Sequence, residues 1–332
     1  MRTTATLSRP QAGFATRRSV LGLGVAGAAG LLASAVTPRL ARAKVAQAPG
    51  SPEIVHNALS DSLHLFQGAG GNVVASVSAE GVLLVDGGLE QDSPALLAQV
   101  AAATGDRRVE LLFNTHWHWD HTGSNAALGK AGAKIIAHEN TRLWLGTHVD
   151  SKWEHRIYPP QPARALPTQT FFYGLQKQSF GGQDVEYAIM PQAHTDGDIY
   201  VFFPRENVLV AGGVVSGGGY PLPDWCTGGW LGGMIDGLKM ILAKADAQTR
   251  IVSGAGAMRT RADVQAQLDM CTAMLAKIGA SYYKGQTWQQ FQDSKPTAEF
   301  DPHWGDPQPF LQMAYDGAWN HVNELRRYTR AR

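Results

Sequence analysis

The strongest constraint on the fold comes from one short segment, NTHWHWDHTG, which follows the apolar run Val109–Phe113. That run predicts a β-strand. Side chains alternate along an extended chain, so His116 and His118 are expected to point the same way. Asp120 and His121 follow where the chain turns toward a helix. Imidazole suits zinc and related metals, so these potential ligands at a strand end predict a metal site.

Strands and helices alternate along most of the chain. Two β-rich runs, Asn72–Val77 and Gly81–Asp86, are separated by a short turn and predict a hairpin. The spacing of apolar residues over Met234–Ala245 predicts a helix. Thr260 with Asp263 has the pattern of a capping box that opens a second long helix. This alternation predicts a layered α/β domain.

The first 43 residues have the features of an export signal. Arg17 and Arg18 directly precede the apolar run Val20–Val36, and the small-residue pattern Ala-Arg-Ala ends at Ala43. Paired arginines in this position indicate the twin-arginine export machinery as a partner, with an uncleaved membrane anchor as the alternative. We therefore expect a twin-arginine signal peptide over residues 1–43 and a periplasmic or secreted mature protein.

The mature part, residues 44–332, has an acidic balance. Six of the 29 Lys and Arg residues precede residue 44, so 23 basic residues face 28 acidic ones, a net charge near −5. This balance argues against a nucleic-acid partner, and removal of the signal leaves no stable membrane insertion. Cys226 and Cys271 are too few for a disulfide framework or a cysteine-based zinc finger, which leaves two thiols or one isolated disulfide.

The histidine-rich segment resembles the signature H-x-H-x-D-H of the metallo-β-lactamase superfamily. Val82–Gly88 resembles the strand and turn that precede this signature, and Pro191–Asp198 resembles the block that follows it. The resemblance runs from about residue 60 to residue 275. It implies an α/β fold, an αββα sandwich with the metals at one edge between the two sheets, in a single domain that covers residues 44–332.

Carried over position by position, the resemblance implies a first metal site made by His116, His118 and His194. Three imidazoles with one open position describe a catalytic zinc site. Asp120 and His121 match the start of a second metal site.

Two later blocks depart from the family pattern. Dinuclear members have a bridging aspartate where this chain has Gly213, and a histidine that completes the second site where it has Ala255. Glycine and alanine side chains carry no donor atoms, so we expect one zinc ion per chain. A replacement ligand would have to come from loop residues such as Cys226, Asp224, His148 or His155.

These features imply a hydrolase acting on a small-molecule substrate. A water ligand of the zinc ion would be activated as hydroxide and attack an ester, lactone, thioester or lactam-type bond. Asp120 is expected to orient that water or act as a base, and Tyr220 to donate to a developing oxyanion. The alternative is a catalytically degenerate binding protein in the periplasm, which the two empty ligand positions favour; an iron-based redox protein is a third interpretation.

Other residues are expected to shape the site. Trp117 and Trp119 flank the ligands and either wall the pocket or pack in the core. Asp86 is expected to orient a ligand from behind. The proline-rich stretch Thr147–Pro167 predicts an irregular loop beside the site.

Overall fold

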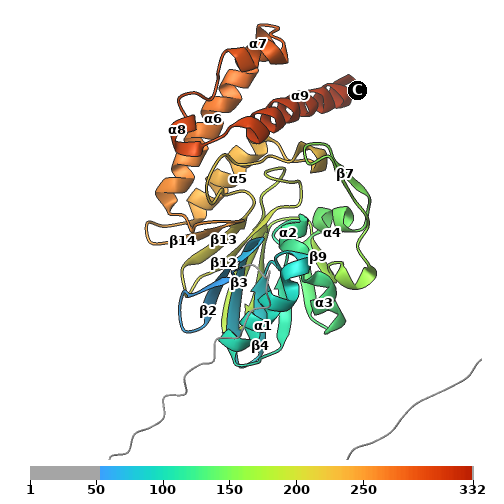
Figure 1. Ribbon diagram of the computed structural model, residues 1–332, viewed down its shortest axis with the longest axis vertical. Helices are drawn as coiled ribbons and strands as arrows, with labels where there is room; N and C mark the ends of the chain where they lie inside the picture. The colour runs from blue at the N-terminus through green and yellow to red at the C-terminus, as the bar shows by residue number, and fades with distance from the viewer. Residues whose placement is uncertain (1–52, 331–332) are drawn as a thin grey trace, which may run out of the picture. The chain divides into compact units, whose positions relative to one another are not determined.

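Two β-sheets form the centre of the domain (Figure 1). The computed structural model describes residues 53–330, with side chains through residue 321, so the predicted signal peptide lies outside the described residues. The first sheet has the strand order β1 (Val55–Ala58), β2 (Leu63–Ala69), β3 (Gly71–Ser78), β4 (Gly81–Val85), β5 (Val109–Phe113), β6 (Lys134–His138) and β9 (Gln169–Phe171). The second has the order β10 (Leu175–Phe180), β11 (Gln183–Ile189), β12 (Ile199–Phe203), β13 (Val208–Gly212) and β14 (Arg250–Ser253).

Strand β4 shows why the sheets pack as layers. All of its residues are buried, and successive side chains of a strand point to opposite faces. Leu83 and Val85 join the apolar cluster that contains Val201 of the second sheet. Val82 and Leu84 join the cluster on the other face of the first sheet. The strand is therefore covered on both sides, which accounts for its continuous apolar sequence.

Helices cover the two outer faces of the sheets. α1 (Ser93–Thr104) contributes to the outer cluster of the first sheet, and α3 (Asn125–Lys130) adds Leu128 there. The outer face of the second sheet packs against α5 (Leu231–Lys244), α6 (Arg261–Tyr283) and the start of α9 (Gln308–Arg330). The order of layers is helix, sheet, sheet, helix, which confirms the predicted αββα sandwich.

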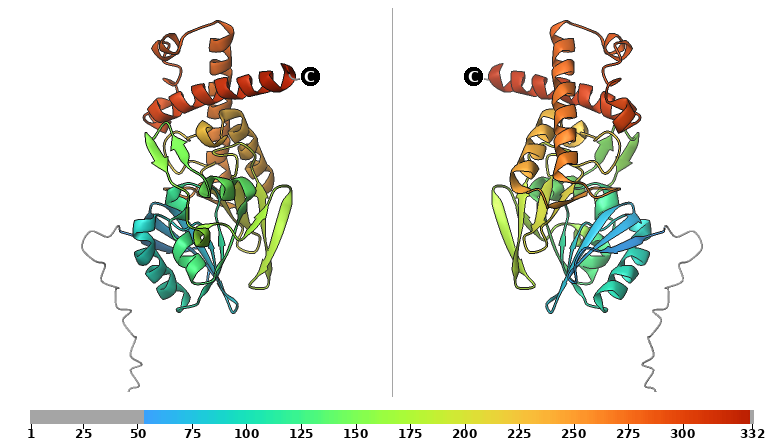
Figure 2. Two further views of the ribbon diagram at one scale, coloured as in Figure 1. Left: turned by 90° about the vertical axis from the view of Figure 1, so that its right-hand side faces the viewer. Right: turned by 90° about the vertical axis from the view of Figure 1, so that its left-hand side faces the viewer.

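The C-terminal helices lie together on the side of the second sheet (Figure 2). Between α6 and α9 the chain forms two short helices, α7 (Trp288–Asp293) and α8 (Asp301–Trp304). The predicted capping box opens α6, because the Thr260 side chain accepts from the Asp263 amide and the Asp263 carboxylate accepts from the Thr260 amide. Among residues 53–330, no helix is long and apolar enough to cross a membrane.

Helix α5 begins three residues before the predicted start, at Leu231 instead of Met234. Gly232 and Gly233 at this end lower the helical tendency of the sequence. A Cβ at Gly233 would lie 1.9 Å from the Gln192 carbonyl oxygen, so glycine is needed for close packing there. This close tertiary contact accounts for the two glycines at the start of α5, which made the first turn of the helix hard to recognise from the sequence.

The functional residues gather at one edge of the two sheets. β4 and β5 are parallel neighbours, as are β13 and β14, so within each pair the carboxyl ends lie at the same edge. Asp86 follows β4, and the histidine-rich segment follows β5 and enters the short helix α2 (Trp119–Thr122). Gly213 follows β13, and Ala255 follows β14.

The stretch after α4 (Glu139–Leu145) is more ordered than the sequence predicted. Thr147–Pro167 contains a small hairpin of β7 (Val149–Ser151) and β8 (Arg156–Tyr158), and a 3₁₀ turn at Ala163–Ala165. The stretch is therefore not the irregular segment that was expected, although it does lie beside the histidines, because Trp153 and Glu154 line their cavity. Val149 and Tyr158 of the hairpin pack in one apolar cluster with Trp117 and Leu145. This tertiary contact stabilises the hairpin, and the proline-rich sequence showed no sign of it.

Candidate metal centre

Three buried histidines meet at this edge of the sheets. One ring nitrogen from each of His116, His118 and His194 lies within 4.8 Å of the others. His118 Nδ1 and His194 Nε2 are 2.8 Å apart. His116 and His118 come from the segment after β5, and His194 comes from the loop between β11 and β12. The fold thus brings together the ligands that the sequence predicted for the first site.

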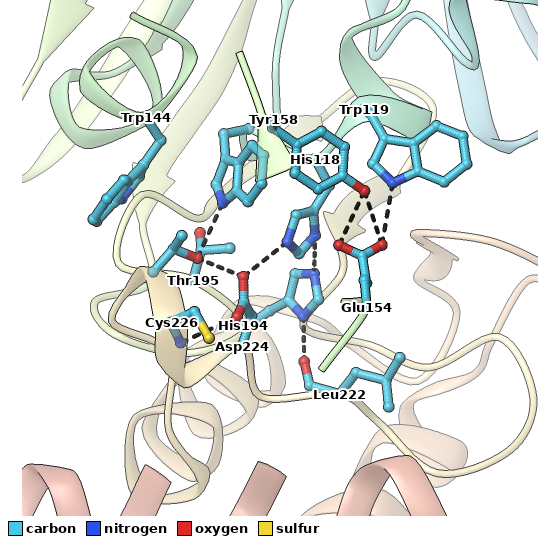
Figure 3. Close-up of polar contacts among 12 residues, drawn as sticks. His118, Trp119, Trp144, Glu154, Tyr158, His194, Thr195, Leu222, Asp224 and Cys226 are labelled. Atoms are coloured by element: carbon cyan, nitrogen blue, oxygen red, sulfur yellow. Dashed lines mark hydrogen bonds and ion pairs between the residues drawn. The ribbon is translucent and has the colours of Figure 1, made fainter. Parts of the chain in front are cut away.

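An aspartate holds His118 from behind (Figure 3). His118 Nε2 lies 3.0 Å from Asp224 Oδ2, and the Thr227 hydroxyl donates to the same oxygen at 2.7 Å. The Trp117 indole donates to Thr227 Oγ1 at 3.0 Å, so the buried tryptophan braces this network. Asp224 was considered above as a replacement ligand; its carboxylate instead orients His118 and leaves Nδ1 directed to the centre.

The other two histidines are also held at their outer nitrogens. His116 Nδ1 lies 3.0 Å from Thr115 Oγ1, and His194 Nδ1 contacts the Leu222 carbonyl oxygen. Burial is the largest cause that lowers the pKa of His116 and of His194, so both rings are held neutral. A neutral imidazole with its second nitrogen fixed by the protein is the form that binds a metal. The donor set therefore fits a zinc ion.

Asp86 organises the residues beside this cluster. It adopts a left-handed backbone conformation with φ of 65°, which is unfavourable for a residue with a side chain. Its carboxylate accepts from the Thr115 amide and hydroxyl, each at 2.7 Å, and from His121 Nδ1 at 2.8 Å. The expected orienting role of Asp86 thus agrees with its contacts.

His121 lies between two carboxylates. Burial alone would lower its pKa, but Asp120 and Asp86 outweigh burial and raise it to about 9. Asp120 Oδ2 lies 3.7 Å from His121 Nε2, and the Asp120 side chain is 34% exposed and lines the cavity. His121 is therefore engaged by acids on both nitrogens, whereas Asp120 remains accessible to a substrate or water.

The three histidines open into a cavity of about 310 Å³. Gly213 and Ala255, the two positions at which the sequence resemblance led us to expect absent second-site ligands, both line this cavity. A Cβ on Gly213 would lie 2.2 Å from His194 Cδ2, so the histidine occupies the space that a side chain would need.

The remaining candidates have different surroundings. The Tyr220 ring lines the cavity, but its hydroxyl donates to Asp301 Oδ1 at 2.8 Å, and this geometry does not support the oxyanion role. The described residues that line the cavity do not include Cys226, His148 or His155. The structure describes both cysteines as free thiols, with Cys271 buried in the core.

Two residues of the cavity wall, Trp153 and Glu154, were not singled out from the sequence; they lie in the turn between β7 and β8. Trp119 lines the cavity from α2, as one of the two sequence interpretations held, whereas Trp117 packs in a buried apolar cluster. The alternation of Val149 and Ser151 with exposed residues was a weak signal for a strand, but no local pattern shows that its turn reaches the histidines.

Comparison with known proteins agrees with this geometry. The metallo-beta-lactamase superfamily matches residues 68–269. A metallo-beta-lactamase from Pontibacter korlensis has a similar fold at 16% identity and a TM-score of 0.53, covering 66% of this chain and 99% of its own. A stereoselective inverting sec-alkylsulfatase from Pseudomonas sp. gives 15% identity and a TM-score of 0.63, over 79% of this chain and 50% of the other.

At these identities the structures show the fold alone, and this chain spans only half of the alkylsulfatase. No curated protein matches the chain in sequence. The superfamily match nevertheless covers more than half of the chain and includes all three histidines. The chain belongs to the metallo-β-lactamase superfamily.

Proposed function

We propose that this protein is a mononuclear zinc hydrolase that cleaves an ester, lactone, thioester or lactam-type bond of a small molecule. The observation that carries the proposal is the cluster of His116, His118 and His194, buried and fixed at each outer nitrogen. A zinc ion held there supplies Lewis acidity, which polarises a carbonyl group and acidifies water.

Asp120 is the chain's own group placed to move a proton. Its carboxylate faces the cavity beside the three histidines. Burial would raise its pKa, but the neighbouring His121 and His118 outweigh burial and lower it, so the carboxylate stays ionised and can accept a proton. With no donor atoms at Gly213 and Ala255, nothing at those positions would hold a second cation near the leaving group. We therefore expect activated esters, lactones and thioesters to be cleaved in preference to amides and lactams.

The rival function is a catalytically degenerate binding protein. The space at Gly213 is filled by His194, and His121 is engaged by Asp86 and Asp120. Both features favour a site that binds no second metal ion and has lost the catalytic activity that depends on it.

Metal content and activity of the mature protein decide between these functions. We expect about one zinc ion per chain by mass spectrometry, with hydrolysis of 4-nitrophenyl acetate, a lactone or a thioester. Asp120→Asn should lower kcat by roughly 10²–10⁴ while zinc content is retained. One zinc ion without any hydrolysis would favour the binding protein, and two tightly held ions would reveal a replacement ligand.

We also propose that the protein is exported by the twin-arginine machinery and acts in the periplasm or outside the cell. The support is Arg17 and Arg18 before the apolar run that leads to Ala43. Intact-mass measurement of periplasmic protein should show a chain that begins near Lys44. A full-length chain in the membrane fraction would contradict export with cleavage.

A further inference from the structure

The β7–β8 hairpin brings a carboxylate to the mouth of the metal cavity. Trp153 and Glu154, in the turn of this hairpin, line the same cavity as His118 and His194. Trp119 lines it from α2. Figure 3 shows Glu154 near Trp119 and Tyr158 and beside His118 and His194. A substrate bound at the histidines would therefore meet the hairpin turn.

The Glu154 carboxylate is held in place by neutral donors. The Tyr158 hydroxyl lies 2.9 and 3.0 Å from its two oxygens, and the Trp119 indole donates at 3.4 Å. The nearby cations have other partners: Lys152 pairs with Asp150, and Arg156 lies over the Trp119 and Tyr158 rings. The negative charge of Glu154 is thus positioned but remains available to a ligand.

The other charged residues of the cavity lining also favour a cationic ligand. The described residues that line the cavity include two carboxylates, those of Asp120 and Glu154, and no Lys or Arg. A carboxylate, sulfate or phosphate group beside Glu154 would be repelled by its carboxylate and would find no Lys or Arg among the described residues of the cavity lining. An ammonium group would gain the Glu154 carboxylate and would lie beside the Trp119 and Trp153 side chains that line the same cavity.

We propose that Glu154 is a specificity-determining residue that selects substrates with a cationic ammonium group on the side remote from the scissile bond. This inference rests on the proposed hydrolase function, because it names the substrate class of the same cavity. Glu154 binds the ammonium group, and the metal centre acts on the neutral bond.

Two isosteric probes separate charge from shape. Choline and 3,3-dimethyl-1-butanol differ by a quaternary nitrogen in place of a carbon, and neither requires turnover. On the zinc-loaded mature protein, ligand-observed NMR titration should show choline binding about tenfold more tightly. Glu154→Gln should abolish this preference. Asp269→Asn removes an exposed carboxylate of α6 that accepts from Gln265 and does not line the cavity, so it should leave the preference intact.

The acetate esters of the two probes extend the test to catalysis. The kcat/KM ratio of the choline ester to its neutral isostere should fall about tenfold in Glu154→Gln and stay constant in Asp269→Asn. Equal binding of the two probes, or equal effects of the two variants, would overturn the inference.

A third variant tests whether the position of the hairpin, and not the charge of Glu154, determines the preference. Tyr158→Phe keeps the carboxylate but removes its hydroxyl donor, so the preference for choline should persist; its loss would mean that hairpin shape, and not the charge of Glu154, selects the ligand. Choline preference without hydrolysis of either ester would support the inference while contradicting the hydrolase. Hydrolysis of both esters with equal kcat/KM would support the hydrolase and contradict the inference about Glu154.

Discussion

The two halves of the metal cavity are built very differently. In the first half, His116, His118 and His194 each have an outer nitrogen fixed by another residue. In the second half, the two positions at which the family resemblance places second-site ligands are Gly213 and Ala255, which both line the cavity. His121, the histidine of that half, contacts Asp86 on one nitrogen and Asp120 on the other.

This difference teaches that possession of ligand-type residues does not by itself make a metal site. A metal ligand needs a free donor atom and a support that holds it there. The first half provides both. In the second half Asp86 is hydrogen-bonded to His121 Nδ1, and Asp120 forms an ion pair with His121 Nε2 at 3.7 Å, so each nitrogen faces a carboxylate. The asymmetry predicts that mutations in the two halves have unequal effects on zinc.

The largest effect should come from the first half. His194→Ala leaves two imidazoles, and zinc affinity should fall about a thousandfold, beyond the roughly 10–100-fold typical of an outer partner. His121→Asn in the second half should retain about one zinc ion per chain, although its contact with Asp86 is weakened. Competition with a fluorescent zinc chelator measures both. Equal loss of zinc in the two variants would show that His121 is a ligand after all.

A smaller effect should follow removal of the support behind His118. Asp224→Ala deletes the carboxylate that fixes His118 Nε2, so zinc affinity should fall roughly 10–100-fold. Asp236→Ala is the matched control, because this exposed aspartate of α5 pairs only with Lys239 on the surface. Isothermal titration with zinc compares them. An unchanged affinity in Asp224→Ala would mean that burial alone positions the ring.

The smallest expected effect concerns Gly213. Gly213→Ala crowds His194, and because His194 Nδ1 is held by the Leu222 carbonyl, zinc affinity should fall about tenfold. Gly213→Asp crowds His194 in the same way, but combined with Ala255→His it supplies two donors, and we expect their binding of a second ion to outweigh the crowding. Metal content should then rise from about one toward two, and ester hydrolysis with it. Isothermal titration with zinc measures the affinity of Gly213→Ala, and elemental analysis together with an ester assay measures the changes in the double variant.

A folded double variant that still holds one ion would show that the second half has closed around the loss. In that case the rival binding function would be the better description of the protein. Loss of folding in Gly213→Ala would instead show that glycine is required there for packing.

The sequence by itself determined a layered α/β domain and the histidine-rich segment, and the family resemblance supplied the αββα order of the layers. The continuous apolar run of β4 and the capping box at Thr260 are local patterns, and each formed the element that it predicted. The segment after β5 placed His116 and His118 on one side of an extended chain, which is a property of backbone geometry. These features depend on neighbours in sequence, and the superfamily resemblance added His194.

Only the tertiary structure decided what surrounds those ligands. Asp224 reaches His118 across 106 positions of the chain, and Tyr220 reaches Asp301 across 81. Glu154 enters the cavity because Val149 and Tyr158 anchor its hairpin against Trp117. Hydrogen-bond partners and occupied space are set by segments that meet only after folding. For that reason the sequence could name Asp224 and Gly213 but not assign what each does.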